Sequence, residues 1–255
     1  IGRRGVGVNP LRGQNNVQGA ADMGCQPHQG AGYFPVADKK IQDFYTEKYG
    51  VVHPTKAGLK IPEIFDAAIN REVKAVWIIG EDVVQTDPNS AHVAKAMNAL
   101  DLLVVQEIFM SETAKHADVV LPGTTFLEKD GTFTNTERRV QRVNKAAEPL
   151  KGTKPDGLIV TEMMQKLGYN QKSYDADEVL AEIADVVPFF KGITRERLGK
   201  LGLQWPVKED GTDTKILHEK EFKLGKGRIK YFDWKESSEI EKNNKDYPLI
   251  LTTSR

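Results

Sequence analysis

The segment VKAVWIIGED, residues 73–82, decides the fold, because a short apolar run passes directly into a polar turn that contains glycine. Two further apolar runs, at 102–106 and 118–121, repeat this pattern along the chain. A helix is expected at 90–100, with Ser90 as its cap, and a shorter one at 112–116. Strands that alternate with helices predict a parallel sheet with right-handed crossovers.

The regions on either side of this core show different patterns. Apolar residues at helical spacing predict helices on both sides, at 38–49, 61–69, 156–167, 176–186 and 194–201. A loop and an irregular hairpin are expected over 128–142. Strand-like sequence at 227–232 and 247–255 indicates that a new domain begins near Asp213. The chain therefore divides into an α/β domain with its opening loop, a loop and helical region, and a final strand-rich segment, at 1–125, 126–212 and 213–255.

The polar turns that follow the three predicted strands form a candidate binding site. In parallel sheets, ligands bind beyond the carboxyl ends of the strands, and those ends meet at one edge. An acidic group such as Asp82 can accept hydrogen bonds from a ribose or a base there. The alternative is an ordinary strand-to-helix turn, capped by Asp87 or Asn89. The residues placed at this edge are Gly80, Glu81, Asp82, Thr86, Gln106, Glu107, Pro122, Gly123 and Thr124.

Composition excludes several classes of protein. The 36 basic residues balance the 36 acidic residues, so no overall positive charge attracts nucleic acid. No apolar run approaches the roughly 20 residues that a membrane span needs. The single cysteine, Cys25, excludes a disulfide framework within the chain and favours a reducing, cytoplasmic compartment. Because the chain opens with Ile1 and closes on an unpaired strand, we expect an internal fragment of a longer protein.

The opening segment GVNPLRGQNNVQG, residues 7–19, is the most specific motif in the chain. The planar guanidinium of Arg12 suits a carboxylate and stays charged at any working pH. Gly13 and Gly19 would let the backbone approach a bulky ligand, while Gln14 and its polar neighbours supply donors and acceptors without charge. The alternative is a polar surface loop whose arginine forms a salt bridge.

This segment, together with AADMG at 20–24, resembles the active-site loop of molybdenum- and tungsten-dependent formate dehydrogenases of the dimethyl sulfoxide reductase family. The resemblance implies that Arg12 and Gln14 act on the substrate. It also implies a final domain that begins a β-barrel. The residues that it assigns to contacts with the cofactor are Gly13, Gln14, Gly80, Glu81, Asp82, Thr86, Gln106, Glu107, Gly123, Asp156, Thr252 and Arg255.

The family resemblance also implies a function. It predicts reversible oxidation of formate to carbon dioxide at a molybdenum or tungsten bis-molybdopterin guanine dinucleotide. A 4Fe-4S cluster is expected in the remainder of the same subunit, with iron–sulfur or flavin subunits as electron-transfer partners, and this chain alone is expected to be inactive. Two alternatives remain open: a related oxidoreductase that acts on nitrate or an arsenic oxyanion, and a non-catalytic scaffold subunit of a respiratory complex.

Overall fold

The computed structural model describes residues 9–219, 221–222, 225, 230–234, 246 and 249. The chain forms two units, Ile1–Thr214 and Lys215–Arg255, and the helices and strands reported below lie in the first. Thr252, Arg255 and most of the strand-like sequence predicted after residue 226 lie outside the described residues. The division at residue 125 stays a prediction.

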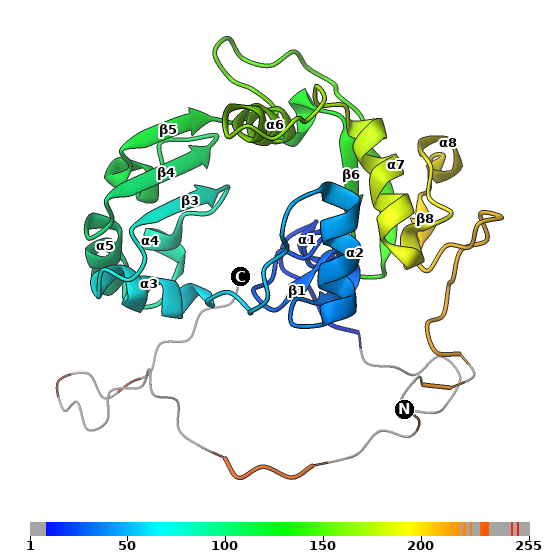
Figure 1. The fold of residues 1–255 in the computed structure, drawn as a ribbon, viewed down its shortest axis with the longest axis horizontal. Coiled ribbons are helices and arrows are strands. Elements are labelled where there is room, and N and C mark those ends of the chain that lie inside the picture. The colour runs from blue at the N-terminus through cyan, green and yellow to red at the C-terminus, as the bar shows by residue number, and fades with distance from the viewer. Residues whose placement is uncertain are drawn as a thin grey trace. The chain divides into compact units, whose positions relative to one another are not determined.

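The first unit contains the predicted parallel sheet, which confirms the α/β fold class. Its strands are β3 (Ala75–Ile79), β4 (Leu102–Glu107) and β5 (Val119–Pro122), in the spatial order β3-β4-β5 (Figure 1). Both pairings are parallel, with Ile79 opposite Gln106 and Glu107 opposite Pro122. All three strands therefore end at the same edge.

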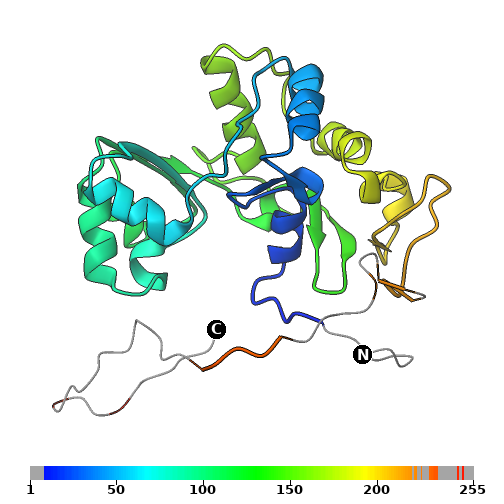
Figure 2. The same cartoon turned by 60° about the horizontal axis from the view of Figure 1, so that its bottom comes forward.

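Helices cover one face of this sheet, as Figure 2 shows for α3 and α5. The covering elements are α3 (Ile61–Ile69), α4 (Val83–Thr86), α5 (Ser90–Asn98) and the 3-10 helix η2 (Thr113–His116). Phe65 and Met97 from the helices pack against Leu103 and Val105 of β4 in one buried cluster. Hydrophobic burial therefore fixes which face the helices occupy and leaves the strand ends to polar residues.

The cap of α5 differs from the sequence-based prediction. Asn89, rather than Ser90, caps this helix: its side chain accepts a hydrogen bond from the His92 amide at 3.3 Å. Asn89 has a left-handed backbone with φ of 60°, which asparagine tolerates better than most residues. The prediction of Ser90 was wrong because the left-handed turn moves the cap one residue toward the amino terminus.

A second, antiparallel sheet follows in the order β6-β7-β8. Its members are β6 (Gly131–Thr134), β7 (Arg139–Val143) and β8 (Leu203–Gln204). The predicted hairpin is confirmed as β6 and β7, whereas β8 was not predicted because it spans only two residues and pairs with β7 across some sixty residues of chain. No closed barrel occurs in the part of the chain that the structure describes.

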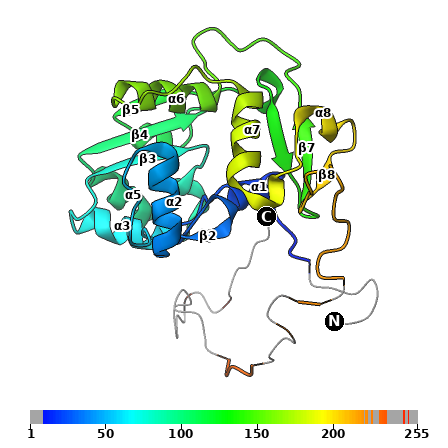
Figure 3. The same cartoon turned by 45° about the vertical axis from the view of Figure 1, so that its right-hand side comes forward.

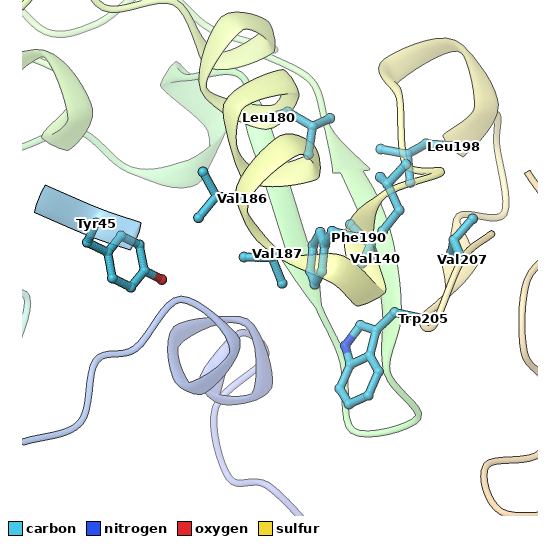
Figure 4. Close-up of a cluster of buried hydrophobic side chains, with 10 residues drawn as sticks. Tyr45, Val140, Leu180, Val186, Val187, Phe190, Leu198, Trp205 and Val207 are labelled. Atoms are coloured by element: carbon cyan, nitrogen blue, oxygen red, sulfur yellow. The ribbon is translucent and has the colours of Figure 1, made fainter. Parts of the chain in front are cut away.

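Helices from the second half of the unit pack against this sheet (Figure 3). They are α7 (Ala176–Val186), α8 (Arg195–Leu198) and the 3-10 helix η4 (Pro188–Phe190). Helix α6 (Asp156–Lys166) and the 3-10 helix η3 (Phe126–Glu128) contribute no residue to the buried apolar cluster on this sheet. Helix α8 is shorter than predicted because Gly199, with φ of 51°, ends it. Leu180 and Val186 of α7, Val140 of β7 and Trp205 belong to one buried apolar cluster (Figure 4).

The opening segment is only partly a loop. It contains α1 (Val17–Asp22) and a short hairpin, β1 (Gln29–Gly30) and β2 (Phe34–Pro35), joined by η1 (Ala31–Tyr33) and followed by α2 (Lys39–Tyr49). The Asn16 side chain accepts a hydrogen bond from the Thr134 amide at 2.9 Å and so fixes the start of α1 to β6. A side chain at Gly19 would meet the Asn16 Oδ1 at 2.2 Å, which explains the glycine.

A buried carboxylate joins α1 to the rest of the unit. Asp22 is fully buried and accepts hydrogen bonds from Gln18 at 2.8 Å, from Tyr33 at 2.7 Å and from the Trp205 indole at 2.7 Å. Trp205 lies 183 residues away in the sequence. Because an unpaired buried charge is costly, these donors fix the position of α1.

No helix in the described part of the chain is long and apolar enough to cross a membrane.

The substitution Trp205→Phe tests this buried network. It should lower the free energy of unfolding by about 1–3 kcal/mol, because one Asp22 oxygen loses its buried donor. Urea denaturation followed by far-ultraviolet circular dichroism measures the change. Trp234→Phe is the matched control, since that side chain is 81% exposed, and should shift stability by less than about 0.5 kcal/mol. Equal losses in the two variants would contradict a structural role for the Asp22–Trp205 hydrogen bond.

Candidate functional site

The candidate site begins with the turns at the carboxyl edge of the parallel sheet. Gly80 follows β3 with φ of 64°, and its amide donates to the Gln106 carbonyl at 2.9 Å. The Gly123 amide donates to the Glu107 carbonyl at 3.0 Å. These backbone hydrogen bonds continue the pairing with β4 one residue past the ends of β3 and β5. The glycines at 80 and 123 are thereby held beside the residues that end β4.

Gln106 is the most buried polar residue at this edge, with 1% of its surface exposed. Its Nε2 donates to Asp156 Oδ1 at 2.7 Å. Its Oε1 is buried and finds no hydrogen-bond partner among the described residues, and the same holds for the hydroxyl of Thr124. Buried polar atoms are nearly always paired, so two unpaired atoms at one strand edge indicate that a ligand group is to be expected there.

Asp156 reaches the edge from the first turn of α6. The backbone of Lys154 bridges to Gly123, and its amide donates to the Pro122 carbonyl at 3.1 Å. This bridge holds the start of α6 beside the end of β5. A Cβ built at Gly123 would lie 3.0 Å from Asp156 Oδ1, so the contact leaves little space for a larger residue. The structure therefore brings together four predicted residues: Gln106, Glu107, Gly123 and Asp156.

The predicted residues after β3 bond mainly within the chain. Asp82 accepts from the Thr113 hydroxyl at 2.7 Å, the Thr113 amide at 2.9 Å and the Glu112 amide at 3.2 Å. Glu81 accepts from the Thr86 hydroxyl at 2.7 Å. Burial acts to raise the pKa of Asp82, but the hydrogen bonds from Thr113 and Glu112 outweigh it, so that pKa is lowered from its usual value. Asp82 is thus an ionised acceptor that holds η2 beside the strand edge.

The opening loop carries the other predicted residues. Arg12, Gly13 and Gln14 are exposed, and among the residues that the structure describes no hydrogen bond or ion pair joins them to the strand edge. Arg12 instead interacts electrostatically with Asp22. Burial raises the pKa of Asp22, while its hydrogen bonds and the charge of Arg12 act to lower it. The guanidinium of Arg12 is therefore open to solvent beside a buried carboxylate.

One residue at the site, Lys129, was not predicted from the sequence. Lys129 forms an ion pair with Asp156, and its ammonium also donates to the Thr124 carbonyl at 3.2 Å. Thr124 carries the unpaired hydroxyl described above. Lys129 lies in the segment interpreted as a loop before the hairpin, and local sequence gives no signal that it meets α6. The only sequence feature that marks Lys129 is its position directly after Thr125 and Glu128, which form the capping box of η3.

Known proteins match this chain over most of its length. The model of the molybdopterin oxidoreductase family matches residues 1–166. The α subunit of an F420-dependent formate dehydrogenase from Methanocaldococcus jannaschii is 46% identical over 260 residues, covering 100% of this chain and 38% of that protein. The α subunits of the F420-dependent formate dehydrogenases 2 and 1 of Methanococcus maripaludis are 44% and 43% identical, again over 100% of this chain and 38% of each relative.

The substitution Asp82→Asn tests the function of Asp82 in the fold. At neutral pH it should lower the free energy of unfolding by about 1–2 kcal/mol, because an amide nitrogen would face donors that now meet a carboxylate. Since the folded-state pKa of Asp82 is lowered, its contribution is present above the ordinary carboxyl range and is lost as pH falls through the folded pKa. The difference between wild type and variant should therefore shrink in acid.

Urea titrations at a series of pH values measure this dependence. Asp43→Asn is a suitable control, because Asp43 forms only an exposed ion pair on α2 and should change stability by less than about 0.5 kcal/mol. A difference between wild type and Asp82→Asn that does not vary with pH would show that the charge of Asp82 does not stabilise η2.

Proposed function

The chain belongs to the molybdopterin oxidoreductase family, and from this premise we propose that it forms part of the catalytic subunit of a formate dehydrogenase. The chain spans about 38% of the length of the curated relatives that it matches. The proposal therefore concerns a holoenzyme of which this chain supplies one wall of the cofactor site. The observation that carries it is the convergence of Gln106, Gly123 and Asp156 at the strand edge, beside two unpaired buried polar atoms.

The residues at this edge fit a guanylated pterin. Gln106 Oε1 is an unused acceptor, and the Thr124 hydroxyl is an unused donor or acceptor, so both suit a ligand rich in N–H and hydroxyl groups. Gly80 and Gly123 keep the adjoining backbone free of side chains. We propose that the nucleotide is held by Gly80, Glu81, Asp82, Thr86, Gln106, Glu107, Gly123 and Asp156, with Gly13 and Gln14 of the opening loop completing the site in this unit.

The opening loop supplies the substrate-binding groups. The exposed guanidinium of Arg12 can form a bidentate pair with the carboxylate of formate, and the Gln14 amide can hydrogen-bond the same anion. Oxidation of formate gives carbon dioxide, one proton and two electrons. When bound, a molybdenum or tungsten pterin centre supplies the two-electron redox chemistry. We propose that a 4Fe-4S cluster in the rest of the subunit, and then iron–sulfur or flavin partner subunits in the cytoplasm, receive those electrons.

Arg12→Ala in the holoenzyme tests the substrate assignment. It should lower kcat/KM for formate more than tenfold, a loss of at least about 1.4 kcal/mol of transition-state stabilisation, because the carboxylate loses its charged anchor. Formate-dependent reduction of an artificial dye measures the rate. Arg71→Ala is the matched control, since Arg71 pairs with Asp101 at the opposite end of β4, and it should leave kcat/KM within about twofold of wild type.

The same assay separates the proposal from its alternatives. Arg12→Ala with unchanged kcat/KM would remove Arg12 from the reaction. A wild-type holoenzyme that reduces nitrate or an arsenic oxyanion but does not oxidise formate would overturn the proposed substrate.

A further inference from the structure

The ion pair between Lys129 and Asp156 has a consequence for Gln106. The ammonium of Lys129 can donate hydrogen bonds but cannot accept them. Asp156 offers one oxygen to that ammonium and the other, at 2.7 Å, to the Gln106 amide. An ionised carboxylate only accepts, so the amide group that faces it must be the nitrogen. The oxygen of Gln106 therefore points the other way.

These contacts fix the orientation of the Gln106 amide, whose nitrogen and oxygen could otherwise exchange positions. A glutamine side chain presents a donor on one side and an acceptor on the other, and the hydrogen-bond partners alone decide which side is which. Here the Asp156 carboxylate, which Lys129 holds in place, decides the orientation of Gln106 and leaves Oε1 as a buried atom without a partner among the described residues. The edge of the sheet consequently offers an acceptor to the ligand.

Lys129 also holds the second unpaired group in place. Its ammonium donates to the Thr124 carbonyl at 3.2 Å, and the hydroxyl of Thr124 is also buried without a partner among the described residues. One side chain therefore contacts both the residue that orients Gln106 and the residue that bears the free hydroxyl. The pair is partly buried, with 26% of the Lys129 side chain and 36% of the Asp156 side chain exposed, so solvent screens it less than a surface pair.

We propose that Lys129 is a positioning residue that holds the Asp156 carboxylate against the Gln106 amide nitrogen, so that Gln106 Oε1 accepts from a ring or exocyclic N–H of a purine. The inference rests on the proposed function, because it takes the guanylated pterin as the ligand. A guanine edge carries adjacent N–H donors, which match the unpaired acceptor of Gln106. If the amide turned over, two donors would face each other and the base would lose its partner.

The test is retention of the guanylated cofactor by the holoenzyme. Acid treatment releases the nucleotide as GMP, and the amount per chain is followed during dialysis of wild type and variants. Lys129→Met should release the cofactor about tenfold faster than wild type, because Asp156 loses the donor that orders it. Lys129→Arg should restore retention to within about threefold, since arginine is also a pure donor. Thermal unfolding of each variant checks that the fold is kept.

Lys154→Met is the matched control. It removes the same charge two residues from Asp156, but the Lys154 ammonium pairs with Glu162 at 2.6 Å and has no contact with the Asp156 side chain among the described residues. Retention in this variant should equal wild type. Equal losses in Lys129→Met and Lys154→Met would overturn the proposal, as would wild-type retention in a folded Lys129→Met.

The double variant Lys129→Met/Asp156→Asn keeps the test decisive if Lys129→Met alone does not fold, because it leaves no unpaired charge. Its release rate should match that of Asp156→Asn, since the lysine acts through the carboxylate; additive losses would overturn the proposal. Wild-type retention and formate oxidation in Lys129→Met would reject the inference while the proposed function stands. A wild-type enzyme that retains guanylate but does not oxidise formate would reject the function alone.

Discussion

The parallel pairing of β3, β4 and β5 is the constraint on which the rest of the site depends. Parallel strands end at a common edge, and the register of Ile79 with Gln106 and of Glu107 with Pro122 aligns those ends. The turn glycines then extend the pairing by one backbone hydrogen bond each. A shift of one residue in β4 would move Gln106 to the opposite face of the sheet and remove it from Asp156.

The opening loop is positioned by a separate set of interactions. Asn16 bonds the backbone of β6, and the buried Asp22 gathers donors from α1, η1 and Trp205. These contacts fix the helix that directly follows the loop, while Arg12 itself stays exposed. The chain thus anchors the helix after the loop and leaves the Arg12 side chain exposed to solvent.

Local sequence predicted most of the fold, because apolar periodicity reports burial directly. The three strands, the covering helices α3, α5 and η2, and the β6–β7 hairpin all follow from patterns within a dozen residues, whereas α4 was not predicted. The elements that were missed depend on distant partners. Helix α1 is held by Asn16 and by Trp205, β8 by its pairing with β7, and Lys129 by an α6 residue 27 positions away. The residues at the strand edge could be proposed from the sequence, but the orientations of their side chains could not.

The unused hydrogen-bonding capacity of the edge residues separates those that support the fold from those able to bind a ligand. Asp82 accepts three hydrogen bonds from the chain, and Glu81 accepts one from Thr86, so much of their capacity serves the fold. Gln106 and Thr124 each retain a buried atom that has no partner among the residues described by the structure. Such an atom costs free energy in the absence of a ligand and repays it when one binds. The same sheet edge therefore contains residues whose polar groups hold the turns and residues with a buried polar atom that has no partner among the described residues.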